Sequence, residues 1–418
     1  MNSLVKSKSK FEDYEQETKM SVAMKGFLVF LLLIFVLAVM NYTSLRRLYH
    51  AITLFNESVI VRNFSHMEDM FDTVEVPKPD TEYIFGRAEQ NLPTTYTYNG
   101  EERSLEGFLA RTSTTALLVL KNDDIVFEEY YLGTQAEDRR MSWSTSKSFL
   151  SAIFGVAVNE GSIASLQDPV TQYVPELIGS GYDGVSIKNV LQMSSGVRFD
   201  ENYDDFNSDI NRFGRMIAFG GSFDEFAASL VNEREPGTYL HYVSLDTHVL
   251  GMVLRKATGR KFVDYFNEKL WSKIGAEDSA AFIVDKFQEP MVLGGMNIRT
   301  RDSARFGKLY LDGGQWNGEQ IVPAQWVYDS TNPDAPHLTP GKRDSSDLDL
   351  GYGYQWWIPE NSDQEFMAVG IYDQFIYVNQ KAGVVIVKSS ANIDFMKNGF
   401  ESTTETVEAF RSIVQSIE

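Results

Sequence analysis

The strongest hydrophobic signal in the chain is an uninterrupted apolar run of fifteen residues at 26–40. It is slightly shorter than a typical membrane-spanning helix, which takes roughly 17 to 25 residues. Snorkelling by Lys25 and an interfacial position for Tyr42 would extend it. We therefore expect residues 26–42 to form an uncleaved, single-pass transmembrane anchor in contact with the lipid bilayer.

Two other interpretations of the run remain open. One is a cleaved signal peptide, whose apolar region spans about 7 to 15 residues, and residues 36–38 are a passable cleavage site inside the run. The other is a buried core helix. Lysines precede the run, whereas Arg46 and Arg47 follow it, so the positive-inside rule favours an internal N-terminus. The large C-terminal part is then expected in the periplasm or another extracytoplasmic space.

The segments on either side of the run have different patterns. Residues 1–25 are polar and charged, and we expect a flexible polar tail. Residues 43–85 are expected to form a stalk or linker, because apolar positions recur at roughly helical spacing before Pro77 and Pro79 end the pattern.

Strands are predicted near both ends of the remaining chain. The apolar run 116–120, the polar turn 122–124 and the run 125–131 together predict a hairpin. Further strands are expected at 351–358, 367–371, 374–378 and 384–388. A final helix is expected to carry Val407 to Ile417 on its apolar face.

Between these strands, residues of about 165–345 are helical and loop-rich in pattern. Strands at both ends with helices between them indicate one α+β domain over 86–418. We expect an antiparallel sheet flanked by helices and built from the N- and C-terminal segments, with a mainly helical inserted domain.

The composition of the chain excludes several classes of function. The net charge is −20, which argues against nucleic acid as a partner. The chain has no cysteine, which excludes disulfides, thiol catalysis and cysteine-ligated metals. His241 and His248 are expected to be packing or surface residues, and no metal or cofactor is expected. The acidic residues of the loop at 200–205 are expected to be solvated.

Ser144 and Lys147 stand at the start of a helix that should be buried, since residues 149–158 are apolar or small on every side. They lie one turn apart on one face. A hydroxyl and an amine held together in this way are the parts of an activated nucleophile. Burying Lys147 would be costly without a role or a partner.

The Ser-x-x-Lys pattern alone is not specific, because it also occurs twice in the polar tail. The alternative is that Ser144 caps the helix and Lys147 lies on the surface. Only at Ser144 and Lys147, however, does the pattern stand at the start of a helix that should be buried.

Two further positions could complete such a site. Tyr242 precedes the helix expected at 245–256, and a phenolate stabilised by Lys147 could serve as a general base. The alternative is that Tyr242 packs at a domain boundary while Ser244 caps the helix. On a late strand, Gly370 would let a substrate approach the strand edge, and the amide that follows could donate to an oxyanion. A bulge is the alternative there.

With these residues assembled, the chain resembles the serine beta-lactamase and penicillin-binding protein superfamily over roughly residues 85–415. It is most similar to the branch that contains class C beta-lactamases, esterases and 6-aminohexanoate-dimer hydrolase. The motifs that carry the resemblance lie at 143–149, 168–177, 191–196, 236–244 and 370–374. The fold implied is the α+β fold of beta-lactamases and transpeptidases.

The resemblance also implies roles for individual residues. Ser144 would be the acylated nucleophile, Lys147 its activating neighbour, and Tyr242 the group that relays the proton to the leaving group. The backbone amides of Ser144 and Ile371 would form the oxyanion hole. The residues expected to contact the substrate are Tyr203, Ser244 and Gly370.

Two departures from the pattern bear on the substrate. Residues 242–244 read Tyr-Val-Ser where penicillin-recognising members have Tyr-x-Asn. Residues 368–370 read Ala-Val-Gly in place of Lys-Thr-Gly. The missing lysine would remove a cation that pairs with a beta-lactam carboxylate, a contact often worth more than about 1.5 kcal/mol.

The expected function is therefore that of a membrane-anchored serine hydrolase. It would form an acyl-enzyme and act on a small-molecule amide or carboxylic ester. One alternative is a D-Ala-D-Ala carboxypeptidase or beta-lactamase. Another is a non-catalytic receptor for cell-wall peptides, which would have no need of Ser144, Lys147 and Tyr242 together.

Overall fold

The computed structural model describes residues 2–360, 362, 364–397 and 401–417. The chain divides into two compact units, Met1–Ile52 and Thr53–Glu418, and each is described by itself.

The N-terminal unit is helical. Helix α1 spans Asn2–Met40 and α2 spans Tyr42–Thr53. Within α1, the segment Lys19–Met40 has a mean hydropathy of 2.8 and none of its most apolar window is buried, so it could cross a membrane by its length and composition. That exposure contradicts the buried-core alternative. The polar residues before it, expected as a flexible tail, are helical instead, in keeping with the absence of glycine and proline there.

The second unit begins earlier in the chain than the boundary expected at residue 86. The segment predicted as a stalk packs into the core, where Leu54 and Phe64 are buried. Its elements are α3 (Ile60–Asn63), η1 (Met67–Asp69) and β1 (Thr73–Val76). Of the apolar positions that predicted a helical stalk, Leu54 is buried in this unit, whereas Leu45 and Ile52 are exposed and belong to the N-terminal unit.

A large sheet organises this unit, with the strand order β12-β13-β14-β15-β16-β5-β6-β2. Its strands are β2 (Gly86–Arg87), β5 (Thr114–Lys121), β6 (Asp124–Tyr130), β12 (Gly351–Tyr352), β13 (Trp357–Ile358), β14 (Glu365–Gly370), β15 (Gln374–Asn379) and β16 (Val384–Ser390). Because β16 pairs with β5, early and late segments share one sheet, as predicted. Among the described strands, β2 is the exception to the antiparallel order, since it pairs with β6 in parallel.

Both faces of the large sheet are covered. In β5, Leu118 and Leu120 join the core on the side of the helical region, whereas Leu117 and Val119 join a second core beneath the C-terminal helix. Successive side chains of a strand point to opposite faces, which explains why this strand is apolar at every position from 116 to 120. Helix α12 (Thr300–Leu311) packs on the first face, and α14 (Glu401–Ser416) packs on the second.

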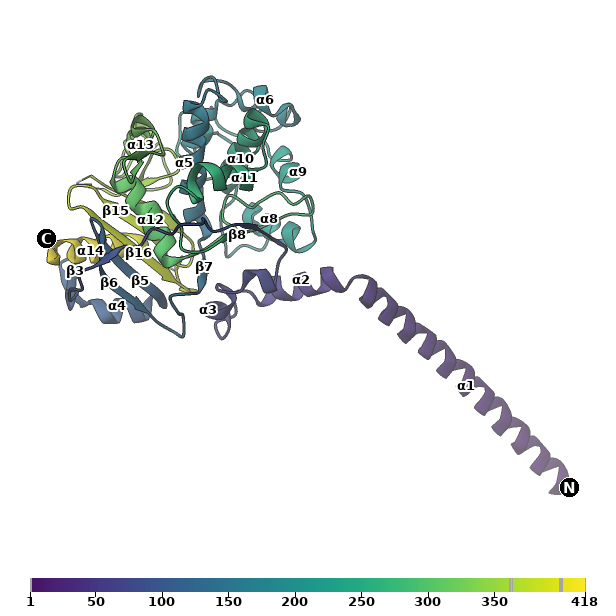
Figure 1. Ribbon diagram of the computed structural model, residues 1–418. Coiled ribbons are helices and arrows are strands. Elements are labelled where there is room, and N and C mark those ends of the chain that lie inside the picture. The colour runs from purple at the N-terminus through teal and green to yellow at the C-terminus, as the bar shows by residue number, and fades with distance from the viewer. Residues whose placement is uncertain (1, 361, 363, 398–400, 418) are drawn as a thin grey trace. The chain divides into compact units, whose positions relative to one another are not determined.

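The helical region lies to one side of this sheet (Figure 1). Its helices are α5 (Ser146–Asn159), α6 (Val170–Tyr173), α7 (Ile187–Leu191), α8 (Asp209–Ala218), α9 (Phe223–Ala228), α10 (Ser244–Thr258) and α11 (Phe262–Phe266). The remaining elements are α4 (Leu105–Arg111), α13 (Ala324–Thr331) and the hairpins β3 (Thr95–Tyr98) with β4 (Glu101–Ser104) and β10 (Gln315–Trp316) with β11 (Glu319–Gln320). Buried α5 and its neighbour α10 confirm the two helices predicted around the candidate residues.

One prediction about strands was wrong. The expected strand at 351–358 is split into β12 and β13, because Gln355 has a left-handed backbone with φ of 63°. The region expected to be mainly helical contributes two strands, β8 (Ala280–Ile283) and β9 (Met296–Arg299), to a second sheet ordered β1-β8-β9-β7, with β7 at Arg139–Met141.

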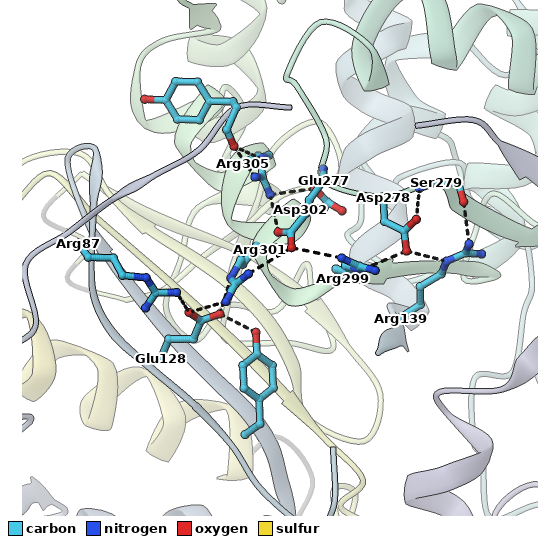
Figure 2. A network of polar contacts seen from close by, with 12 residues as sticks. Arg87, Glu128, Arg139, Glu277, Asp278, Ser279, Arg299, Arg301, Asp302 and Arg305 are labelled. Carbon is cyan, nitrogen blue, oxygen red and sulfur yellow. Dashed lines mark hydrogen bonds and ion pairs between the residues drawn. The ribbon is translucent and has the colours of Figure 1, made fainter. Parts of the chain in front are cut away.

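A network of arginines and carboxylates links the two sheets (Figure 2). Arg301 on α12 contacts Glu128 of β6 at 2.6 Å and Glu277 at 3.1 Å. Arg299 on β9 contacts Glu277 at 3.2 Å and Asp278 at 3.0 Å. The loop that carries Glu277 and Asp278 therefore joins the second sheet to the first, and the second sheet contains the strand that leads into Ser144.

Candidate active site

Ser144 lies in the single turn Trp143–Thr145 that directly precedes α5. Two side chains fix this turn. The Thr145 hydroxyl donates to the carbonyl of Ser142 at 2.9 Å, and the Ser146 hydroxyl donates to the carbonyl of Val292 at 2.8 Å. Ser144 is half-buried, whereas residues 146–157 of the following helix are buried, so the Ser144 hydroxyl lies at the edge of the core.

Lys147 is only 2% exposed, which rules out the surface position considered from the sequence. Its Nζ lies 3.0 Å from Oγ of Ser144 and 2.5 Å from the carbonyl oxygen of Leu293. Burial lowers the pKa of Lys147 to about 7, and the negative charge of Glu201 partly opposes the shift. A substantial fraction of this amine is therefore neutral near pH 7 and can accept the serine proton.

Tyr242 lies at the start of α10, with its ring centroid 5.3 Å from Nζ of Lys147. Trp357 of β13 stacks on the other side at a centroid distance of 5.3 Å. Burial, and then the charge of Glu201, raise the pKa of Tyr242, while hydrogen bonding to Ser144 opposes the shift. This shift favours the protonated phenol at neutral pH over the phenolate considered from the sequence, and it favours Lys147 as the base.

Glu201 is the residue that sequence reasoning placed wrongly, as part of a solvated acidic loop. Its carboxylate accepts hydrogen bonds from the hydroxyls of Ser244 at 2.6 Å and Tyr203 at 2.8 Å. Burial raises its pKa, an effect opposed mainly by the charge of Lys147. Tyr203 faces the site as expected, but Ser244 is buried behind Glu201. Because Glu201 and Ser244 are 43 residues apart, no local sequence pattern indicates the hydrogen bond between them.

Gly370 ends β14 directly beside the turn of Ser144. A Cβ at this position would lie 2.7 Å from the carbonyl oxygen of Ser142 and 3.1 Å from the amide nitrogen of Ser144. Only glycine permits this approach, and it brings the following residue, Ile371, next to the nucleophile turn. The structure therefore brings together the two backbone segments expected to form an oxyanion hole.

Gln374 holds the turn between β14 and β15, and sequence reasoning gave it no role. Its buried amide nitrogen donates to the carbonyls of Ile371 at 3.3 Å, Tyr372 at 2.9 Å and Ser390 at 2.8 Å. Its Oε1 accepts from the amide of Ser390 at 3.2 Å. This one side chain ties the Ile371 turn to β16.

A cavity of about 480 Å³ opens at Ser144. Apolar residues form much of its wall, and four carboxylates also line it. These carboxylates belong to Glu201, Asp204, Asp347 and Asp373. None of the lining residues that the structure describes is lysine or arginine, and Ala368 is buried in β14 without lining the cavity.

His241 and His248 have protein partners. Nδ1 of His241 lies 2.9 Å from a carboxylate oxygen of Asp347, and Nε2 of His248 lies 2.7 Å from one of Asp224. Within the described residues, no group of three or more histidine, aspartate or glutamate side chains could hold a metal ion.

A buried lysine beside a half-exposed serine, a tyrosine over that lysine and a strand edge against the serine amide define the class as a serine hydrolase site. The Beta-lactamase family profile matches residues 102–392. The chain belongs to this family and is a serine hydrolase of the amidase and esterase kind.

One curated protein is similar to this chain in sequence, and two solved structures share its fold. The chain is 32% identical to the 6-aminohexanoate-dimer hydrolase of Paenarthrobacter ureafaciens over 295 residues, which cover 69% of this chain and 75% of the relative. A Bacillus anthracis structure provisionally named a 6-aminohexanoate-dimer hydrolase shares the fold with a TM-score of 0.78, 24% identity, and coverage of 87% and 96% of the two chains. A family VIII carboxylesterase has a TM-score of 0.54, 16% identity, and coverage of 73% and 96%.

Proposed function

We propose that this protein hydrolyses a small amide or carboxylic ester through an acyl-enzyme on Ser144. The observation that carries the proposal is the position of the buried Lys147 amine, 3.0 Å from Oγ of Ser144, which lines the cavity. The neutral amine accepts the serine proton as Oγ attacks the substrate carbonyl.

In the same mechanism, the amides of Ser144 and Ile371 stabilise the oxyanion of the tetrahedral intermediate. Tyr242, held protonated, donates a proton to the leaving group and regains one from Lys147. Water then attacks the acyl-enzyme, and the same groups act in reverse order. Lys147 and Tyr242 thus transfer the protons, and the two amides stabilise the negative charge.

The cavity favours neutral or cationic substrates over anionic ones. Four carboxylates line it, and the described lining residues include no lysine or arginine. Asp204 is exposed, so its carboxylate is available to an ammonium group on a substrate. An amide with a free amino group, such as an amino-terminated 6-aminohexanoate amide, fits this charge pattern better than a penicillin carboxylate does.

The substrate preference can be measured with matched p-nitroanilides of 6-aminohexanoic acid and adipic acid, which differ mainly in terminal charge. We expect a higher kcat/KM for the amino-terminated compound, and Asp204→Asn should reduce the difference through KM. Equal values for both compounds, or faster cleavage of the anionic one, would contradict the preference.

The reaction itself is tested by treating the full chain and Ser144→Ala with a fluorescent fluorophosphonate and, separately, with a fluorescent penicillin. We expect fluorophosphonate labelling of the wild type only. Strong penicillin labelling that the variant loses would favour the carboxypeptidase or beta-lactamase alternative. Labelling by neither reagent would refute the enzyme mechanism.

For localisation, we propose a single-pass protein whose catalytic unit is extracytoplasmic. Support comes from the length and composition of Lys19–Met40 and from the lysines that precede the apolar run. Protease protection in spheroplasts should show an accessible catalytic unit that sediments with membranes. A protected unit would contradict the orientation, and a soluble one would indicate cleavage.

A further inference from the structure

Four aromatic rings join the start of the second unit to both backbone turns of the active site. They belong to Phe55, Phe64, Trp143 and Tyr372. Every pair of these rings is in contact, with centroid distances from 5.0 to 6.4 Å. The closest pair is Phe55 and Tyr372, which stack at 17°.

Two of the rings belong to strained backbone positions. Trp143 precedes Ser144 and has a φ of 46°, and Tyr372 follows Ile371 and has a φ of 59°. Bulky residues rarely adopt this left-handed conformation. Such backbone persists where the surrounding structure holds it, and here the side chains of both residues pack in one cluster.

The other two rings come from a segment that is itself fixed to the nucleophile strand. Nη1 of Arg140 donates to the carbonyl of Val61 at 2.7 Å and to the hydroxyl of Ser65 at 2.6 Å. The amide of Met141 donates to the carbonyl of Phe64 at 2.9 Å. Residues around Phe64 thus form a rigid base from which the rings contact Trp143 and Tyr372.

We propose that Phe55 is a positioning residue of the active site. Its ring holds the side chains of Tyr372 and Trp143 together, and so keeps the amides of Ile371 and Ser144 aimed at one point. The proposal rests on the function proposed above. Phe55 does not line the cavity, so its removal should affect the chemical step rather than substrate binding.

The test uses the full chain with Phe55→Ala, which removes the ring, and Phe55→Tyr, which keeps it. Phe55 is 40% exposed, so its truncation should lower Tm less than the loss of a buried ring would, and a melting curve gives the folded fraction at the assay temperature. Phe287→Ala is the matched control, since that ring is 60% exposed and does not line the cavity.

For Phe55→Ala we expect the fluorophosphonate acylation rate and kcat for an ester to fall about tenfold or more, because small displacements of an oxyanion hole slow the chemical step. KM should change little, and Phe55→Tyr and Phe287→Ala should retain wild-type rates. If Phe55→Ala does not fold, Phe55→Leu, which keeps the apolar volume without the ring, carries the same expectation.

Wild-type rates in Phe55→Ala, or a loss that follows only the unfolded fraction, would overturn the positioning role while leaving the proposed function intact. A wild-type protein that is not acylated at Ser144 would overturn both. The two failures are therefore distinguishable in one set of measurements.

Discussion

At the scale of single residues, the ionisation of Lys147 should set the pH dependence of the reaction. Its pKa is lowered to about 7 by burial, and only the neutral amine accepts the serine proton. Below that pH, kcat/KM should fall about tenfold per pH unit, and above about pH 8 it should level off. A profile from about pH 5.5 to 8 with a good ester substrate measures this, and a flat profile would contradict it.

Glu201 provides the control for that profile, because its negative charge raises the pKa of Lys147. In Glu201→Gln the lysine should lose its proton more readily, so the rising limb should move to lower pH. If the rising limb of the Glu201→Gln profile lies at the same pH as in the wild type, a group other than Lys147 controls the rate.

Gln374 gives a second prediction at this scale. Gln374→Leu would remove a donor from the buried carbonyl of Ser390 and the closer of two donors from that of Tyr372, which keeps the amide of Asn392 at 3.4 Å. We expect this to cost about 1 to 3 kcal/mol. The Ile371 turn would loosen, so kcat should fall more than KM rises. Gln325→Leu, which removes an exposed contact with Asp329, should leave steady-state kinetics unchanged. Equal kinetics for both variants would contradict a role for the turn.

At the scale of elements, the close approach of β14 to the nucleophile turn should tolerate no added side chain. Gly370→Ala would place a Cβ 2.7 Å from the carbonyl oxygen of Ser142, so the two segments must separate. We expect kcat to fall by about a hundredfold. Gly107→Ala on α4, where a Cβ would meet its nearest atom at 3.4 Å, should keep full activity. Comparable rates in the two variants would argue against the oxyanion assignment.

The elements that the sequence predicts well are those with a strong local pattern. β5 is apolar because both faces of its sheet are covered, and α5 is apolar because it lies inside the domain. The split at Gln355 depends on one left-handed residue that no hydrophobic pattern encodes. Likewise, the burial of Glu201 depends on Ser244, which is distant in the chain.

At the scale of the whole molecule, the network in Figure 2 should contribute to stability through buried charge. The Glu128 side chain is 4% exposed and contacts Arg301 at 2.6 Å. Arg301→Ala removes this contact, whereas Arg87 remains at 2.6 Å and the Tyr130 hydroxyl at 2.7 Å. We expect a loss of about 1.5 to 3 kcal/mol in the free energy of unfolding, measured by urea denaturation.

Two further variants make that prediction specific. Glu128→Leu combined with Arg301→Met removes both charges and should recover much of the loss. Lys273→Ala, which breaks an exposed pair with Glu319, should cost less than about 1 kcal/mol. A single Arg301→Ala variant as stable as Lys273→Ala would contradict the stabilising role of the network.

The boundary of the catalytic unit shows why the whole molecule was harder to predict than its parts. Residues 43–85 were predicted to form a stalk or linker because apolar positions recur there at roughly helical spacing, and a local pattern does not show which surface it covers. In the structure Phe64 is fully buried, with its backbone bonded to Met141 on the strand that leads to Ser144.

The central claim is that Ser144, activated by Lys147, is the nucleophile. Its most direct test is peptide mapping by mass spectrometry after reaction of the full chain with a fluorophosphonate. We predict one adduct, on the peptide that contains Ser144, and a greatly slowed reaction in Lys147→Arg, whose side chain cannot give up its proton. An adduct on another residue, or equal labelling of Lys147→Arg, would contradict the mechanism.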